Sequence, residues 1–468
     1  MKNEEKITQT GMKILIIGIN AKYSHTSLAV YSISAFLKSK NIENTALEYT
    51  INDSYHSIFY DIVKQKPNVI GFSTYIWNIS IVKRLISDIK KALPNVKIIL
   101  GGPEAGYSDE KFIGVDKIIA SDGETEFFNY LTDSNDKIEF ENLPFPYPAS
   151  LGTGKTAYYE SSRGCPYKCS YCISSIEKNL RFKRLETVKK DISFFIDNGF
   201  KKVKFIDRTF NINQNAYEIF EFIIANDNGN IGFHFEIKAE LFSDKDIELL
   251  SKARKGLIQL EIGLQSLNPD TLLAINRQND IEKAFSNIKK LTKNDNMRIH
   301  LDLIAGLPHE DLSSFISGFN TVYKELNAHI LQLGFLKILN GTKIKEEASS
   351  HDIKYSSHPP YQVISTKYLS IFDIIELQTC EVGLDAISNK GFFRNSLKFL
   401  FENNNISPYD LFKMCGAQIE KKPPLSMPDL FSLFYNIYCG NDFYDKDSLK
   451  KHLISDFKIK NPTKSLNL

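Results

Sequence analysis

The chain has 468 residues, 42% of them hydrophobic, which is enough apolar material for the cores of two or three domains. Its 58 basic and 56 acidic residues give a net charge of +2, which argues against a dedicated nucleic-acid-binding protein with a strongly basic face. The first eleven residues lack the apolar stretch of a signal peptide, and no apolar run approaches the ~18 residues of a membrane span. We therefore expect a cytoplasmic protein without a membrane segment or a nucleic-acid-binding domain.

The first block of sequence, residues 12–131, alternates short apolar runs with amphipathic segments. The expected elements are strands at 13–19, 69–74 and 96–102, and helices at 27–40 and 80–93. Continuous apolar strands separated by helices are typical of a doubly wound parallel sheet, covered on both faces. The fold class predicted for this block is therefore α/β, of the Rossmann type.

Ligands of such sheets bind beyond the carboxyl ends of the strands. Four segments fall at that edge: residues 20–27, 73–78, 101–106 and 121–126. The glycines of 101–106 allow the backbone to approach a ligand closely. Residues 121–126 open a helix, whose free N–H groups suit polar ligand groups. Each segment alone is equally well explained as a tight turn, but their placement at one edge favours a binding site.

A second alternation follows a proline-rich linker, residues 132–153, in which three prolines within five residues oppose regular structure. Residues 154–338 contain six βα repeats. The expected strands are 155–162, 203–207, 233–239, 258–266, 297–307 and 330–336, separated by helices such as 184–199, 219–227, 246–253 and 313–326. Six repeats are too few for an eight-unit barrel, so a partial (β/α)6 barrel or a strongly twisted open sheet is expected.

The last block, residues 339–468, has helical periodicity at 362–387 and 392–405, which predicts a mainly helical C-terminal domain. Its three cysteines, Cys380, Cys415 and Cys439, lie far apart in the sequence, without neighbours at metal-ligand spacing, and are expected to be ordinary buried thiols. Residues 356–363 are expected to form a loop at the edge of the cavity where the substrate binds.

Three further cysteines, Cys165, Cys169 and Cys172, lie within eight residues, directly after the first predicted strand of the second block. A structural zinc site takes four ligands, and the nearest histidine in the sequence, His234, is more than sixty residues away. A disulfide would leave one thiol over. An iron–sulfur cluster held by three thiolates leaves one iron free to bind a substrate or cofactor, and this interpretation is favoured over zinc.

The spacing CxxxCxxC, with aromatic Tyr171 before the last cysteine, resembles the signature of the radical S-adenosylmethionine (radical SAM) superfamily. The resemblance implies a 4Fe-4S cluster on Cys165, Cys169 and Cys172, whose open iron chelates S-adenosylmethionine. It also implies a one-electron donor, such as flavodoxin or ferredoxin, that cleaves this cofactor to a 5′-deoxyadenosyl radical.

The same resemblance assigns residues at the ends of later strands to S-adenosylmethionine. The cofactor-binding residues that it implies are Tyr171, Asp207, Thr209, Glu236, Gln265, Arg277 and Gly306. Arg277, twelve residues after Gln265 as in the oxygen-independent coproporphyrinogen oxidases, would hold the carboxylate of the cofactor, and Gly306 would let the backbone approach the adenine. The chain departs from the usual pattern at Arg208, where relatives have a second acidic residue.

Two of these assignments have an open alternative. Tyr171 is as well explained by packing when the resemblance is set aside. Glu236 is alternatively a buried carboxylate paired with Lys238 or Arg254.

The first block resembles the cobalamin-binding domain of class B radical SAM methylases, and the whole chain resembles a subgroup with a C-terminal domain of unknown function, DUF4080. The residues implied to contact cobalamin are Ser73, Thr74, Trp77, Gly101, Gly102, Pro103, Glu104, Gly123 and Glu124. The chain lacks the DxHxxG motif that supplies a histidine to cobalt, since neither His25 nor His56 lies in that pattern. The lower face of a bound cobalamin is thus expected to have no histidine ligand. Trp77 is equally well explained as a core or lid residue.

The leading hypothesis is a cobalamin-dependent radical SAM methyltransferase that methylates an unactivated carbon of an unknown substrate. One alternative is a radical SAM enzyme that abstracts hydrogen or rearranges its substrate without cobalamin. Another is a nonenzymatic metal-binding scaffold. A methylthiotransferase is set aside because such enzymes carry a second three-cysteine cluster in the N-terminal domain, whereas residues 1–164 contain no cysteine. The sequence assigns no catalytic residue.

Overall fold

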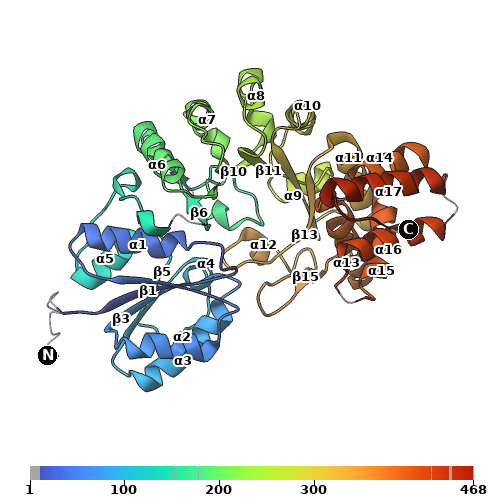
Figure 1. Ribbon diagram of the computed structural model, residues 1–468. Helices are drawn as coiled ribbons and strands as arrows, with labels where there is room; N and C mark the ends of the chain where they lie inside the picture. The colour runs from blue at the N-terminus through green and yellow to red at the C-terminus, as the bar shows by residue number, and fades with distance from the viewer. Residues whose placement is uncertain (1–10, 152–153, 178, 423, 442–444, 467) are drawn as a thin grey trace.

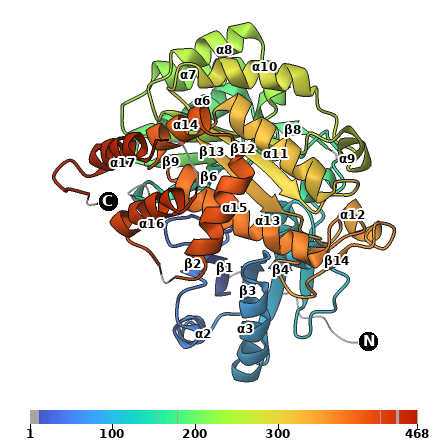
Figure 2. The same cartoon turned by 90° about the vertical axis from the view of Figure 1, so that its right-hand side faces the viewer.

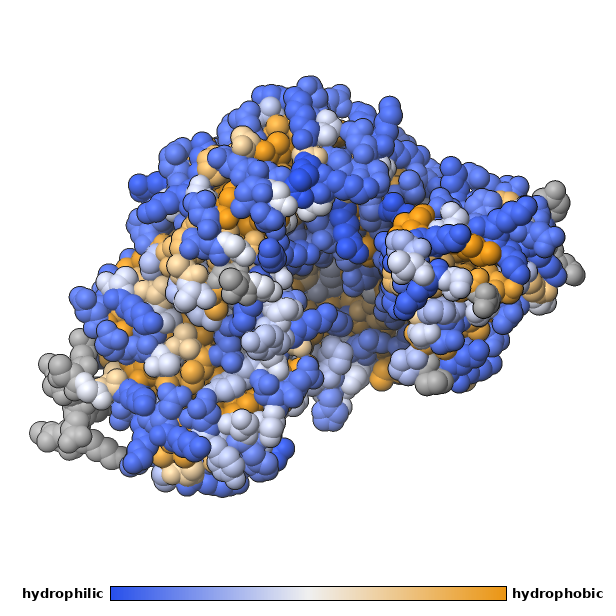
Figure 3. All heavy atoms as spheres, in the orientation of Figure 1, coloured by the Kyte–Doolittle hydropathy of each residue, from blue (hydrophilic) through white to orange (hydrophobic). Residues whose placement is uncertain are grey.

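The structure is a computed structural model that describes residues 11–151, 154–177, 179–422, 424–441, 445–466 and 468. An N-terminal α/β domain packs beside a second, larger α/β domain, and a group of helices follows at the C-terminus (Figure 1). The space-filling view shows a hollow between these three parts (Figure 3). No helix in the described ranges is long and apolar enough to cross a bilayer.

The N-terminal domain is a five-stranded parallel sheet with the order β2-β1-β3-β4-β5. Its strands are β1 (Ile14–Asn20), β2 (Thr45–Thr50), β3 (Val69–Ser73), β4 (Lys97–Gly101) and β5 (Lys117–Ile119). Helices α1 (Leu28–Ser39) and α5 (Gly123–Thr132) cover one face, and α2 (Tyr55–Lys64) and α3 (Ile79–Ala92) cover the other (Figure 1). This confirms the predicted doubly wound sheet. The two edge strands, β2 and β5, were not predicted because β2 is half-exposed and β5 has only three residues.

The second domain is a six-stranded parallel sheet in chain order, curved into a partial barrel, as predicted. Its strands are β6 (Thr156–Tyr159), β9 (Lys202–Phe205), β10 (Gly232–Ile237), β11 (Ile258–Gln265), β12 (Arg298–Ala305) and β13 (Ile330–Phe335). The helices on its outer face are α6 (Leu185–Asp197), α7 (Ala216–Ala225), α8 (Asp244–Ser251), α10 (Ile281–Thr292) and α11 (Leu312–Leu326) (Figure 2). Strands β6 and β13 do not pair with each other, so the barrel is open.

Residues alternate along these strands between the helices and the inside of the barrel. On β11, Ile258, Leu260, Ile262 and Leu264 are buried in the apolar core, and the residues between them are only partly buried. Because successive side chains of a strand point to opposite faces, the intervening polar residues line the inside of the barrel. The open barrel therefore has a polar interior.

The segment that follows β1, residues 20–27, docks onto the open barrel edge at β6. Thr156 N–H donates to Ser24 O at 2.7 Å, and Thr26 N–H donates to Thr156 O at 3.2 Å. The hydroxyl of Tyr158 lies 2.8 Å from His25 Nδ1. This segment, expected at the ligand-binding edge, thus joins the two α/β domains.

The C-terminal domain is mainly helical, as predicted. Its helices are α13 (Ile371–Gly383), a π-helical turn (Leu384–Asn389), α14 (Arg394–Asn403), α15 (Pro408–Ile419), α16 (Met427–Cys439) and α17 (Lys446–Lys460). The helix expected from residue 362 is wrong at its start, because Val363–Ser365 form strand β15, paired with β14 (Lys354–Tyr355). Helix α13 begins only at Ile371, where the side chains of Ser370 and Asp373 form a capping box.

Helices α13 and α15 cross at a pair of glycines. A Cβ atom on Gly383 would lie 1.8 Å from Phe412 O, and one on Gly416 would lie 1.8 Å from Thr379 O. The two backbones can approach this closely only because neither residue has a side chain. Gly318, inside α11, has no such constraint, since its nearest neighbour would be Leu267 Cβ at 3.6 Å.

We expect Gly383→Ala to destabilise the protein by at least about 1–3 kcal/mol, because the added methyl group forces the two helices apart. Gly318→Ala is the matched control, expected to be neutral or stabilising by about 0.5–1 kcal/mol, the usual gain in a helix. Thermal unfolding followed by circular dichroism measures both. Equal melting temperatures for the two variants would contradict the described crossing.

Candidate functional site

A cavity of about 170 Å³ opens at the carboxyl ends of β9 to β12. Eight of the residues singled out in the sequence line it together: Cys165, Cys169, Tyr171, Cys172, Thr209, Glu236, Gln265 and Arg277. They come from the loop after β6 and from three different strand ends, and the fold brings them to one place. We call this space the cysteine cavity.

The cysteine loop is held by backbone contacts from both sides. Gly164 has φ +95°, and a Cβ there would lie 2.4 Å from Asn179 O, so only glycine fits at the entry of the loop. Ser170 N–H donates to Ile275 O at 2.9 Å, just after α9 (Pro269–Ala274). Ser170 O accepts from Ile344 N–H at 2.9 Å, in α12 (Lys343–Glu346).

Arg277 joins the loop to β11. Its guanidinium donates to Tyr171 Oη at 3.2 Å and to Cys169 Sγ at 3.7 Å, and also to Gly263 O. Gly263 makes room for this arrangement, since a Cβ there would lie 2.0 Å from Gln265 Nε2. Gln265 itself has φ +71°, and its buried Oε1 has no hydrogen-bond partner among the described residues.

The donor set of the cysteine cavity fits an iron–sulfur cluster. Thiolates are the ligands of such clusters, and Cys165 Sγ also lies 4.0 Å from Thr209 Oγ1. In the described ranges, no three His, Cys, Asp or Glu side chains form a group that could hold a single metal ion. The unpartnered Gln265 Oε1 offers a further acceptor to a molecule bound beside the thiols.

The structure places the side chain of Asp207, which the sequence assigned to the cofactor, inside the protein. Its side chain is fully buried and does not line the cavity. The carboxylate accepts from Ser161 N–H at 3.0 Å and from the hydroxyls of Ser161 and Ser162 at 2.5 and 2.6 Å. Burial raises its pKa to about 6, although these three hydrogen bonds act in the opposite direction. Asp207 therefore fixes the turn before the cysteine loop.

Gly306 also lies outside the cavity. Its φ is +93°, and a Cβ there would lie 2.8 Å from Val363 Cγ1, so this glycine is needed for packing against β15. Glu236 does line the cavity, but its partners differ from the two that sequence suggested. Its carboxylate lies 3.7 Å from Lys204 Nζ and 3.8 Å from Arg208.

The inside of the barrel below the cavity holds a chain of charged groups. Glu261 lies 3.2 Å from Lys204 Nζ and 2.8 Å from His234 Nε2. Burial alone would raise the pKa of Glu261, but His234 and Lys204 outweigh it and lower the pKa to about 2. Burial lowers the pKa of His234. Glu261 is therefore an anion at neutral pH. Lys204 lies within ion-pair distance of both Glu236 and Glu261.

A second cavity, of about 340 Å³, lies between the N-terminal sheet and the cysteine loop. Of the residues assigned to cobalamin, six line it: Ser73, Gly101, Gly102, Pro103, Gly123 and Glu124. The cavity reaches Ile16 of β1 and Ser73 at the end of β3, the two strands between which the order of strands reverses, and such a switch point is where doubly wound sheets bind ligands. We call it the interdomain cavity.

The other three residues assigned to cobalamin do not line this cavity. Thr74 is buried and donates its hydroxyl to Gly101 O at 2.7 Å. Glu104 accepts from the hydroxyl of Tyr361 at 2.8 Å, which ties α4 (Pro103–Gly106) to residues 356–363. Those residues were expected to edge the substrate cavity, but neither cavity includes them. Trp77 is 42% exposed and stacks on Tyr75, with ring centroids 4.4 Å apart.

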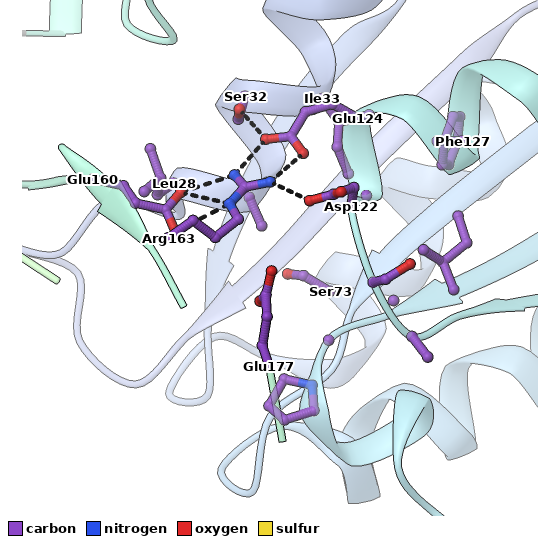
Figure 4. A pocket seen from close by; sticks show the side chains of 18 of the residues that line it. Leu28, Ser32, Ile33, Ser73, Asp122, Glu124, Phe127, Glu160, Arg163 and Glu177 are labelled. Atoms are coloured by element: carbon purple, nitrogen blue, oxygen red, sulfur yellow. Dashed lines mark hydrogen bonds and ion pairs between the residues drawn. The ribbon is translucent and has the colours of Figure 1, made fainter. Parts of the chain in front are cut away.

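Arg163, two residues before Cys165, anchors the cysteine loop to the N-terminal domain (Figure 4). Its guanidinium donates to Asp122 at 3.0 Å, to both oxygens of Glu124 at 3.0 and 3.1 Å, and to Glu160 at 2.8 Å. Glu124 also accepts from Ser32 at 2.5 Å. We call these residues the Arg163 network. The residues predicted from the sequence did not include Arg163. The available signals were its position just before the cysteines and the acidic residues within 121–126.

Arg208 is the one residue that lines both cavities among those described. It follows β9, directly after the buried Asp207. In the sequence, this position stood out only because relatives have an acidic residue there. Its guanidinium lies near enough to Tyr75, Glu160 and Cys172 to interact with them electrostatically. The two cavities therefore meet at Arg208.

Three parts of the chain match known protein families. Residues 159–318 match the radical SAM superfamily, residues 14–130 the B12 binding domain, and residues 349–468 a protein family of unknown function, DUF4080. These matches identify a B12-binding domain followed by a radical SAM domain and a DUF4080 domain within this chain.

Two relatives that are named as methyltransferases match part of the chain. The chain is 24% identical, over 58% of its length, to the cobalamin-dependent radical SAM methyltransferase TokK of Streptomyces tokunonensis. Over 56% of its length, the chain is 23% identical to the 2-(S-pantetheinyl)-carbapenam-3-carboxylate methyltransferase of Streptantibioticus cattleyicolor. It spans 47% and 45% of these relatives, less than half of each.

Solved structures share the fold. The radical SAM methyltransferase TsrM from Kitasatospora setae, with a tryptophan substrate and a SAM analogue bound, has a TM-score of 0.63 at 13% identity, covering 87% of this chain and 96% of its own. The cobalamin-dependent enzyme OxsB, with aqua-cobalamin and S-adenosylmethionine bound, has a TM-score of 0.63 at 13% identity. The match covers 96% of this chain and 79% of the OxsB chain.

We expect Arg163→Met to lower the free energy of unfolding by about 3–5 kcal/mol, because it leaves buried Glu124 without its cation. Arg184→Met is the control. Arg184 forms an exposed ion pair with Glu141 at 2.9 Å, and such pairs contribute little. Denaturant unfolding measures both variants. Equal effects would contradict the described role of the Arg163 network.

Proposed function

We propose that the protein is a cobalamin-dependent radical SAM methyltransferase that methylates an unactivated carbon of a substrate yet to be identified. The observation that supports this most strongly is the meeting, at Arg208, of a cavity lined by three cysteines with a cavity in a B12-binding domain. When bound, the 4Fe-4S cluster and S-adenosylmethionine supply a 5′-deoxyadenosyl radical, and cobalamin supplies the methyl carrier.

In this proposal, the residues of the cysteine cavity bind and orient S-adenosylmethionine. Cys165, Cys169 and Cys172 hold the cluster. Arg277, positioned by Tyr171 and Gly263, faces the carboxylate of the cofactor, and such charge-assisted hydrogen bonds are among the strongest in proteins. The buried Gln265 Oε1 gains a partner from the cofactor. Thr209 and Glu236 supply further polar contacts.

The interdomain cavity binds cobalamin in the same proposal. Apolar residues from the sheet and from α1 and α5, including Ile16, Ile99 and Phe127, form its inner part. Ser73, Gly101 and Gly102 lie at the strand ends, where the backbone is free to approach a large ligand. The cobalamin proposed here has no histidine ligand from this chain, since the DxHxxG motif is lacking. An external one-electron donor completes the system.

Replacing any one of Cys165, Cys169 and Cys172 by alanine is expected to abolish both cluster binding and S-adenosylmethionine cleavage, because each thiolate holds its own iron. Cys439→Ala, in the helical domain, serves as the control and should keep full iron content. Iron and sulfide analysis after anaerobic reconstitution, with quantification of 5′-deoxyadenosine, measures both properties. A wild-type protein that binds zinc and never cleaves the cofactor would instead indicate a nonenzymatic scaffold.

Gly101→Leu is expected to block cobalamin binding and leave the cluster intact. Gly101 lines the interdomain cavity, and a Cβ there would meet no atom closer than Ile119 O at 3.9 Å, so a side chain can be added here without a clash at its Cβ. We expect corrinoid content to fall at least tenfold, with iron content and 5′-deoxyadenosine formation retained. Visible spectra and metal analysis measure these quantities.

The wild-type protein in the same experiment separates the proposal from its main alternative. Stoichiometric corrinoid binding supports the methyltransferase. A wild-type protein that cleaves S-adenosylmethionine but binds no corrinoid would identify a cobalamin-independent radical enzyme and refute the proposed methyl transfer.

A further inference from the structure

The guanidinium group of Arg208 has unused hydrogen-bond donors. Its nearest acidic partner is Glu236, at 3.8 Å, which is too long for a hydrogen bond. Its side chain is 44% exposed, and it donates to no other group in the described part of the chain. Arginine carries five N–H donors in a planar fork, so most of its binding capacity is available here.

The other cations that line the two cavities are already engaged. Arg163 donates to three carboxylates of its network. Arg277 donates to Gly263 O and Tyr171 Oη. Lys238 lies 2.9 Å from Glu240 and donates to Gln278 O. Among the described cationic residues that line the two cavities, Arg208 alone donates no hydrogen bond within the protein, and Arg277 is already assigned to the cofactor in the proposed function.

The position of this free guanidinium identifies what it can bind. In the proposed function the substrate lies between the two cofactors, where the two cavities meet, and Arg208 lines both cavities. Glu160 and Glu236 interact electrostatically with Arg208 and hold it in its charged form. A carboxylate or phosphate group can accept two parallel hydrogen bonds from the fork of an arginine.

We propose that Arg208 binds an anionic group of the substrate, a carboxylate or a phosphate, and thereby holds the substrate between the two cofactors. This inference rests on the proposed function. Arg208 is thus a specificity-determining residue, and the substrate is an organic acid or phosphate ester. The same anion would not be expected to compete with S-adenosylmethionine, whose carboxylate faces Arg277.

The test uses the holoprotein with its cluster, cobalamin in the paramagnetic cob(II)alamin state and S-adenosylmethionine, at constant ionic strength. The probes are sodium [13C]acetate and inorganic phosphate, and the readout is the relaxation of 13C and 31P by the nearby cobalt. We expect saturable enhancement for at least one probe, and the probe that responds identifies the kind of anion.

Arg208→Gln should weaken this binding at least about tenfold. Arg208→Lys should retain part of it, and Arg184→Gln is the matched control.

Two outcomes would overturn the inference. One is equal relaxation in wild type and Arg208→Gln. The other is an anion effect that is seen only in a sample prepared without S-adenosylmethionine, together with weaker binding of that cofactor to Arg208→Gln, which would assign Arg208 to the cofactor. Iron and corrinoid contents are measured beforehand, so a protein that fails to load its cofactors contradicts the proposed function and is distinguished from one that loads them but binds no anion.

Discussion

One buried guanidinium connects the two halves of this site. Arg163 precedes the cysteine loop and is shared by three carboxylates, two of them at the start of α5 in the N-terminal domain. Separating buried charges that are paired in this way is costly. The network therefore fixes where the cysteine loop lies relative to the interdomain cavity, and the adjacency of the two cavities depends on it.

Three consecutive residues that follow shortly after β9, Asp207, Arg208 and Thr209, have different roles in the site. Asp207 is directed into the protein, where Ser161 and Ser162 use both of its oxygens. Arg208 reaches both cavities, and Thr209 lines the cysteine cavity. An anion at Asp207 stabilises the turn that carries the cysteines, and the cation beside it remains available at the junction. Asp207 thus has a structural role, whereas its neighbours Arg208 and Thr209 line the cavities.

Much of the fold follows from patterns within the sequence. Apolar runs predicted the central strands of both sheets, and the repeat of strand and helix predicted their parallel arrangement, because such patterns reflect burial on both faces. Edge strand β2 and the start of α13 were missed or misplaced, since half-exposed strands have a weak pattern and a capping box at Ser370 overrode the periodicity before it.

The sequence by itself determined the chemistry that is available: three thiols at a fixed spacing, a glutamine at the end of a strand with an arginine twelve residues later, and glycines where a ligand approaches the backbone. Only the tertiary structure decided which side chains reach the cavities, separating Asp207, Gly306, Thr74, Trp77 and Glu104 from the residues that line them. The physical reason is that spacing along a chain fixes local neighbours. The direction of a side chain at a strand end, by contrast, depends on hydrogen bonds and ion pairs to residues distant in the sequence.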